Sequence, residues 1–205
     1  MKNKLAENML RFGTKNLTES QLENIQETEL NEAFDSSWAN NNIAPILQKA
    51  SDSNTPANKI PAFQAGPFII QVTVDKDKYG DPIYQGNVYG FGIDVNGLIG
   101  ITDKGYDTNT NFTWKPAAGI TEFEPNLDRL DKSVQGMNTA YSQKVPSYMK
   151  TKVVDAFKVY YNGLNDRLKQ KVQNGLAAFK ANPKGLTGNA LAMQLAFADT
   201  TQVPG

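Results

Sequence analysis

The amino-acid sequence predicts an α+β protein in which a central antiparallel β-meander, at about residues 67–115, is flanked by N-terminal helices and a C-terminal helical hairpin. Apolar residues recur at helical spacing near both ends of the chain, whereas the middle is rich in β-branched residues with a period of two. The dipeptide Asn96-Gly97 separates two apolar runs, which is typical of a β-hairpin. The predicted parts are an N-terminal helical segment (1–38), a linker or loop (39–61) and an α+β domain (62–205), with its sheet at 67–124 and its helices at 126–198.

The N-terminal segment is predicted to contain two helices. The apolar positions of the first helix are Leu5, Met9 and Phe12. The second helix begins at a capping box, residues 18–21, and its apolar positions are Leu22, Ile25, Leu30 and Phe34. Asn, Ser, Ala and Pro dominate residues 36–61, which predicts a loop with at most a short helix around residues 43–50.

Residues 4–19 have the sequence KLAENMLRFGTKNLTE. This segment resembles an opening that recurs at the start of uncharacterised proteins from Bacteroidetes. The resemblance implies no activity, but an opening shared by unrelated proteins implies a docking or targeting element gripped through the Leu5, Met9 and Phe12 face. The alternative, favoured by the helical spacing, is an ordinary first helix packed on the core.

Strands are predicted at residues 68–74, 83–95 and 98–101, with a further short strand near residues 111–114. One face of the second strand is rich in glycine and therefore has few side chains. This face contains Tyr84, Gly86, Gly90 and Gly92. Glycines allow close approach to the backbone of a strand. The favoured interpretation is a closely packed helix or a bent strand, and the alternative is the floor of a ligand groove walled by Tyr84.

The C-terminal region is predicted to be helical. Leu127, Leu130, Val134, Met137 and Tyr141 alternate in steps of three and four, which favours a seam between helices of one domain over an interface between copies. After Pro146 a second apolar stripe continues to Phe179 with an interruption at Asn162-Gly163, and a short helix follows at residues 189–198. Phe157, Tyr161 and Leu164 either fill the space beneath the sheet or leave a cavity for a lipid.

Composition restricts the chemistry that the chain can perform. None of the 205 residues is His or Cys, which removes the usual neutral-pH general base, the thiolate nucleophile and the soft ligands of transition metals. The 21 basic residues balance the 21 acidic residues, so net charge does not favour binding to nucleic acid. The cations that gather at residues 144–184 are interpreted as a solvated helix face.

The turn between the first two strands holds the candidate metal ligands Asp75, Asp77 and Asp81. Alternating oxygen ligands before a glycine are typical of the first half of a calcium loop. However, Tyr79 occupies the third ligand position, and Asp, Gly and Pro are common in turns without metal. A plain hairpin turn is therefore favoured, no cofactor is expected, and calcium is the alternative.

Two carboxylate pairs, Glu122 with Glu124 and Asp94 with Asp103, are the candidates for acid and base catalysis. Acidic residues near turns are usually solvated, and no complete catalytic motif accompanies these pairs, so the chain is not expected to be an enzyme. A carboxylate-dependent hydrolase acting on a glycan or cell-wall polymer is the alternative. Lipid binding is the third.

The sequence therefore predicts a non-catalytic binding or structural module that binds a protein partner or its own copies, and not nucleic acid. The N-terminus lacks the apolar core of a signal peptide, so the cytoplasm is the default location. Export by a route that uses no signal peptide is the alternative, as an exported or particle-associated protein with an N-terminal docking segment. No run approaches the roughly 20 apolar residues of a membrane span, so no transmembrane segment is expected.

Overall fold

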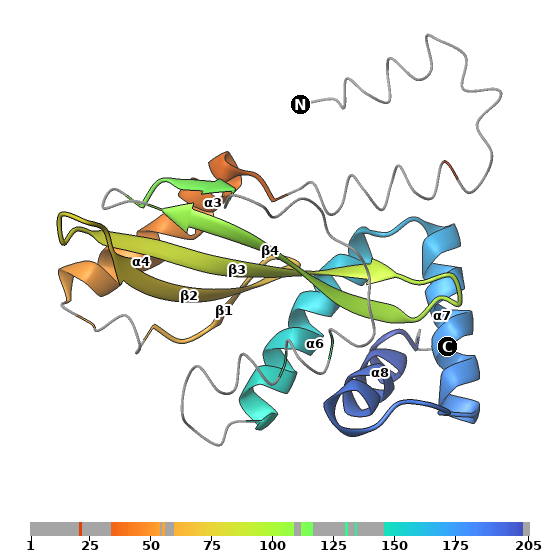
Figure 1. The fold of residues 1–205 in the computed structure, drawn as a ribbon. Coiled ribbons are helices and arrows are strands. Elements are labelled where there is room, and N and C mark those ends of the chain that lie inside the picture. Colours follow the sequence, from red (N-terminus) through yellow and green to blue (C-terminus); the bar gives the residue numbers. More distant parts are fainter. Residues whose placement is uncertain are drawn as a thin grey trace, which may run out of the picture.

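The computed structural model describes residues 21, 34–53, 55, 60–108, 112–116, 130, 134 and 146–202. These residues form an α+β fold in which an antiparallel meander is flanked by helices that precede and follow it in the chain, as predicted (Figure 1). Leu5, Met9, Phe12, Glu122 and Glu124 lie outside the described residues. Within the described part, no helix has both the length and the apolar character needed to span a bilayer.

Within the described residues the sheet has five strands in the order β1-β2-β3-β4-β5, so each strand pairs with its neighbours in the chain. The strands are β1 (Phe63–Ala65), β2 (Phe68–Lys76), β3 (Pro82–Ile93), β4 (Ile99–Thr108) and β5 (Trp114–Pro116). All four pairings are antiparallel, and β3 pairs along its length with β2 and β4. The sequence did not predict β1. The short strand that it predicted near residues 111–114 corresponds to β5, which begins at Trp114.

The β3–β4 turn differs from the expected two-residue hairpin at Asn96-Gly97. The backbone N–H of Asp94 donates to the Leu98 carbonyl at 2.9 Å, and the Gly97 N–H donates to the Asp94 carbonyl at 3.0 Å. Gly97 has a φ of +82°. This is a type I turn followed by a left-handed residue, the usual three-residue hairpin loop. The correction follows from Asp94, which opens the turn, so that β3 ends at Ile93, two residues before the predicted end.

Residues 39–61, expected to be a linker or loop with at most a short helix around residues 43–50, contain that helix as α4 (Ala44–Asp52), and a further helix, α3 (Ser36–Asn42), precedes it. Asp35 caps α3, because its carboxylate accepts a hydrogen bond from the Trp38 N–H at 2.6 Å. Three residues four apart, Ala39, Ile43 and Leu47, are fully buried. This short apolar stripe holds the segment on the sheet although the residues between are mostly polar.

The C-terminal region forms α6 (Pro146–Gly163), α7 (Asp166–Ala181) and α8 (Gly188–Thr200). The Asn165 side chain caps α7 by accepting from the Leu168 N–H at 2.8 Å, so the predicted interruption at Asn162-Gly163 is a break between two helices. Gln194 of α8 donates a side-chain hydrogen bond to the backbone carbonyl of Ile99, at the start of β4. Leu130 and Val134, predicted as seam positions, are helical and buried.

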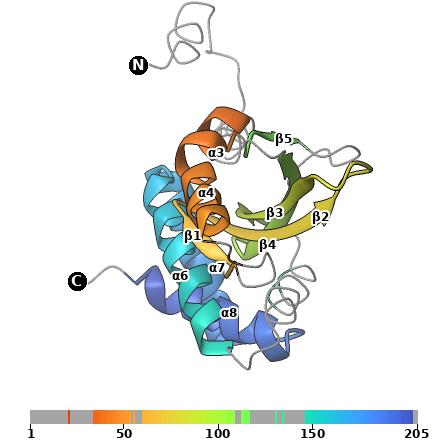
Figure 2. The ribbon, with the colours of Figure 1, turned by 90° about the vertical axis from the view of Figure 1, so that its left-hand side faces the viewer.

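Two hydrophobic cores lie on opposite faces of the strands. Even-numbered strand residues such as Ile70 and Tyr106 pack with α3 and α4, while odd-numbered residues such as Phe91 and Ile101 pack with α6, α7 and α8. Viewed along the molecule, β2, β3 and β4 curve past α3 and α4 (Figure 2). The helices therefore cover one face near the β2–β3 turn and the other face near the β3–β4 turn.

Candidate functional site

The β2–β3 and β3–β4 turns have the same construction, based on the pattern Asp-x-x-Gly. Asp77 Oδ1 accepts backbone N–H groups from Tyr79 at 2.8 Å and from Asp81 at 2.9 Å. The Asp77 N–H donates to the Asp81 carbonyl at 2.8 Å, and the Gly80 N–H donates to the Asp77 carbonyl at 3.0 Å. Four hydrogen bonds therefore fix five residues, so this exposed turn is rigid.

This geometry gives the carboxylates of two of the three candidate calcium ligands, Asp75 and Asp77, backbone partners. The Asp77 carboxylate is turned inward onto the backbone, and Asp75 Oδ1 accepts the N–H of Lys76 at 2.8 Å. Among the described residues, which include Asp75, Asp77 and Asp81, no group of three acidic side chains converges as a metal site would require. The arrangement of these residues is that of a capped hairpin turn.

We expect Asp77→Ala to lower the free energy of unfolding by about 1 kcal/mol, because two backbone N–H groups lose their acceptor. Asp77→Asn retains an amide oxygen as acceptor and should cost less. Thermal unfolding of the three proteins, with calcium and with chelator, provides the measurement. A calcium-dependent rise in the wild-type midpoint that Asp77→Ala abolishes would contradict the turn interpretation.

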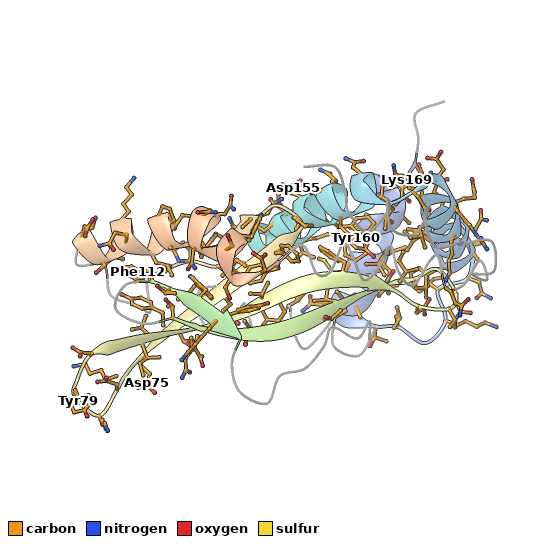
Figure 3. All side chains as sticks on the ribbon, turned by 90° about the horizontal axis from the view of Figure 1, so that it is seen from above. Asp75, Tyr79, Phe112, Asp155, Tyr160 and Lys169 are labelled. Carbon is orange, nitrogen blue, oxygen red and sulfur yellow. The ribbon has the colours of Figure 1, made fainter. Side chains whose placement is uncertain are left out.

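The β2–β3 hairpin extends beyond its neighbouring strands. β1 pairs only with residues 68–70 of β2, and β4 ends at Thr108, opposite Tyr84. Residues 75–83 therefore form an arm that has no neighbouring strand among the described residues, and Figure 3 shows its residues Asp75 and Tyr79 at the far end from α7. Tyr79, at the tip, has 77% of its surface exposed, and Lys78 Nζ lies 4.8 Å from the centre of its ring.

A shallow polar groove of about 260 Å³ lies at the base of this arm. Its lining residues are Gln71, Thr73, Gln85, Gly86, Asn87, Gly105, Tyr106 and Asp107. The Tyr89 hydroxyl donates to Gln71 Oε1 at 3.0 Å, and Thr73 Oγ1 donates to the Gln85 carbonyl at 3.2 Å. With Asp107 as the one charged lining residue, the groove offers mainly neutral hydrogen-bonding groups.

The opposite, glycine-containing side of β3 is filled. A Cβ atom on Gly86 would lie 2.8 Å from the ring of Trp114, so the glycine makes room for that indole. Tyr84 is buried, with its ring centre 4.6 Å from that of Phe112, and Gly90 and Gly92 are also buried. The open groove thus lies on the face of Gln85 and Asn87, which the sequence did not single out.

Behind the groove, Tyr106 belongs to the buried side of the sheet. Its hydroxyl donates to the Phe34 carbonyl at 3.3 Å, and its ring centre lies 4.4 Å from that of Phe34. Burial raises the pKa of this phenol above its ordinary value, and the negative charge of Asp35 adds to the effect. Tyr106 therefore stays neutral and acts as a structural support at physiological pH.

The catalytic candidates do not come together in the described part of the structure. Asp94 Oδ1 accepts the N–H groups of Asn96 and Leu98, both at 2.8 Å, so this carboxylate holds the β3–β4 turn. Asp103 lies in β4 opposite Tyr89. Glu122 and Glu124 lie outside the described residues. No acid and base pair can be assembled from the described carboxylates of this set.

Aromatic side chains fill the space between the odd-numbered face of the sheet and the C-terminal helices. Phe157 is fully buried, and its ring centre lies 5.7 Å from that of Phe91 and 4.4 Å from that of Phe197. Tyr161 and Leu164 are buried in the same core. The cavity that a lipid carrier needs is therefore occupied here by the protein's own side chains.

Comparison with known proteins identifies no relative, since no family model, curated protein or solved structure matches the chain.

Proposed function

We propose that the protein is a non-catalytic binding module that holds a protein partner through the arm, residues 75–83, and the polar groove at its base. The observation that carries this proposal is the position of Tyr79, which is 77% exposed at the tip of a hairpin fixed by the Asp77 turn. A tyrosine displayed there offers a partner a large ring and a hydroxyl at a fixed position.

The physical properties of the arm suit a protein interface. Tyrosine is enriched among the residues that dominate binding energy, because it buries a large rigid surface and keeps a hydroxyl for hydrogen bonding. A turn that is already rigid loses little conformational entropy on binding. In the groove, Gln85 and Asn87 are exposed amides that can donate to and accept from a partner's backbone.

The charge of the arm indicates how the partner is selected. Its three aspartates and two lysines leave a net charge of only −1, and residues 75–78 alternate in sign. Long-range attraction therefore contributes little, and the partner is expected to offer an apolar pocket for the Tyr79 ring beside polar backbone groups. Its binding should depend only weakly on salt concentration.

The other functions expected from the sequence receive less support. The hydrolase requires converging carboxylates, and Asp94 is engaged in its turn. Lipid carriage requires space that Phe157 and its neighbours fill. The exported or particle-associated form of the binding module, docked through the Leu5, Met9 and Phe12 face, rests on the resemblance of residues 4–19 alone.

Site-specific photo-crosslinking tests the proposal in the organism that makes the protein. A photoreactive phenylalanine analogue at position 79 should capture one defined protein, whereas the same analogue at Val159, which is also exposed but lies on α6, should not. Tyr79→Ala should then weaken the affinity of the purified partner by about ten-fold or more, as for a central interface aromatic residue. Equal crosslinking at both positions, or unchanged affinity, would reject the arm as the binding site.

A further inference from the structure

The edge of β2 that faces away from β3 has no neighbouring strand over residues 72–76 in the part of the chain that the structure describes. We call this stretch the β2 edge. β1 covers the same side of β2 only as far as Ile70, which pairs with Phe63. Continued in that register, the chain before β1 would place Pro61 opposite Val72. Proline has no N–H to donate to a ladder, so the pairing ends before the arm begins.

The register of the β2–β3 hairpin determines which backbone groups face the β2 edge. At the turn, the Asp77 N–H donates to the Asp81 carbonyl, which makes these two residues a hydrogen-bonded pair. Hydrogen-bonded and non-hydrogen-bonded pairs alternate along an antiparallel ladder. The odd-numbered residues of β2 therefore bond to β3. The N–H and C=O groups of the even-numbered residues Val72, Val74 and Lys76 point away from β3, toward the β2 edge.

The backbone of the β2 edge is open at its centre and closed toward the turn. Outside the sheet ladder, no backbone hydrogen bond joins Val72 or Val74 to another described residue. The N–H of Lys76, in contrast, donates to Asp75 Oδ1 at 2.8 Å. The N–H and C=O groups of the two valines are therefore the ones that a new strand can bond. An extended backbone, with its own alternating donors and acceptors, is the group that matches them.

The opposite edge of the hairpin is less suited to an added strand. The Asp94 N–H donates to the Leu98 carbonyl, so the backbone groups of the even-numbered residues of β3 face β4. β4 ends at Thr108, opposite Tyr84. The next residue of β3 toward the turn that faces this side is Pro82, which has no N–H. Of the two edges of the hairpin, that of β2 is therefore the one that can donate.

The side chains on the two faces of the β2 edge define the strand that fits it. Val72 is buried and Val74 is half-buried against the core that β2 shares with α3 and α4. Thr73 and Asp75 are exposed on the other face, which is that of the polar groove. Residues directly opposite on paired strands place their side chains on the same face. The added strand should therefore alternate apolar residues beside the valines with polar ones, including a lysine or arginine beside Asp75.

A second copy of the chain fits the β2 edge poorly. Two-fold symmetric pairing of two such edges is antiparallel. With Val74 opposite Val74, Lys78 of one copy lies opposite Ile70 of the other. Phe63 of β1 already occupies that place. The next hydrogen-bonding register toward the turn sets Asp75 opposite Asp75, and like charges directly opposite one another are destabilising. A separate partner strand that ends before β1 has neither restriction.

We propose that the protein partner contributes an extended strand, which pairs with the β2 edge and continues the sheet. This mode of binding, which rests on the proposed function, specifies the form of the partner at the base of the arm. Main-chain hydrogen bonds to Val72 and Val74 supply affinity, and the alternating side chains supply specificity. Tyr79, at the tip of the same hairpin, then contacts the partner beyond the end of its strand.

Random peptides displayed on phage and selected on the purified protein provide the probe. The selected sequences should alternate apolar and polar residues, and Val74→Pro should weaken binding of the best synthetic peptide by about ten-fold or more. Because the Val74 N–H points away from β3, proline removes an edge donor without breaking the β2–β3 ladder. Val74→Ala keeps the N–H and should bind the peptide nearly as well as the wild type.

Amide hydrogen exchange of the wild-type protein gives a readout that does not depend on the folding of Val74→Pro. Exchange at Val72 and Val74 should slow by about ten-fold or more when the peptide is added, because their N–H groups gain acceptors. The Asp77 N–H already donates to the Asp81 carbonyl, so its exchange should change little.

Tyr79→Ala distinguishes failure of this proposal from failure of the arm proposal. Its β2 edge is unchanged, so it should bind the selected peptide whatever the crosslinking at position 79 shows. A selection that yields no peptide weakened by Val74→Pro, or unchanged exchange at Val72 and Val74, would overturn the proposal. Self-association of the wild type that Val74→Pro abolishes would also overturn it, because a second copy would then occupy the β2 edge.

Discussion

Phe157→Ala is expected to lower the free energy of unfolding by about 4 kcal/mol, because it removes a buried ring and leaves a cavity. Phe157 is fully buried in α6, and its ring centre lies within 6 Å of those of Phe91, Tyr161 and Phe197. These rings come from the sheet, α6 and α8, so one truncation loosens three elements. Phe157 therefore joins the C-terminal helices to β3.

Urea unfolding measures this effect, and Val159→Ala provides the control. Val159 lies on the same helix with 45% of its surface exposed, so its truncation should change stability by about 0.5 kcal/mol or less. Similar costs for the two variants would mean that the space beneath the sheet is not closely packed. Lipid carriage would then regain support.

Gly97→Ala is expected to cost about 3 kcal/mol, since two penalties act on one methyl group. The first is backbone strain, because Gly97 has a φ of +82°. The second is steric, because the new Cβ would lie 2.3 Å from the Lys171 carbonyl oxygen, a backbone atom of α7 that cannot turn away. Relief requires the whole turn to move off the helix.

Gly80→Ala separates these two penalties. Gly80 occupies the same position of the equivalent turn with a φ of +89°, but a Cβ there has nothing within 4 Å. Its cost should be the backbone strain alone, about 1 kcal/mol. Urea unfolding of both variants gives the difference. Equal costs would show that the β3–β4 turn does not rest on α7.

The strands were the most predictable part of the fold. β2 and β3 begin and end within two residues of the predicted positions, because β-branched runs bounded by Asp, Gly and Pro leave little alternative. The break between α6 and α7 was also legible at Asn162-Gly163, and Asn165 provides the next cap. In these segments, local preference and tertiary packing agree.

The missed elements are those whose local preference is weak. α3 depends on burial of Ala39 in the core on the even-numbered face of the sheet, a long-range contact that an Asn-rich segment does not encode, whereas α4 lies where a short helix was allowed. β1 is three residues long and exists through its pairing with Phe68–Ile70. The β3–β4 turn was expected to be a two-residue turn at Asn96-Gly97. It is a three-residue turn because the Asp94 carboxylate accepts the N–H groups of Asn96 and Leu98.

The candidate site was harder to predict than the fold. The sequence favoured a plain turn at Asp75, Asp77 and Asp81 and close packing on the glycine face of β3, with calcium and a ligand groove as the alternatives, but it did not single out Tyr79 and Gln85 as the exposed binding residues of the hairpin. Which face of β3 stays open depends on where Trp114 lies. The sequence did contain a signal for the exposed turn residues. The pattern Asp-x-x-Gly occurs twice, and each time a large apolar residue, Tyr79 or Val95, lies between the Asp and the Gly.

The hydrogen bond from Gln194 to the Ile99 carbonyl joins residues that are 95 positions apart in the chain. On the ribosome, the meander emerges in strand order and its hairpins close locally, long before α8 has been translated. Until then the start of β4 presents this carbonyl as an open strand edge, the kind of template on which nascent chains aggregate. Translation of the last helix is therefore also the step that removes a misfolding hazard left by the first half of the protein.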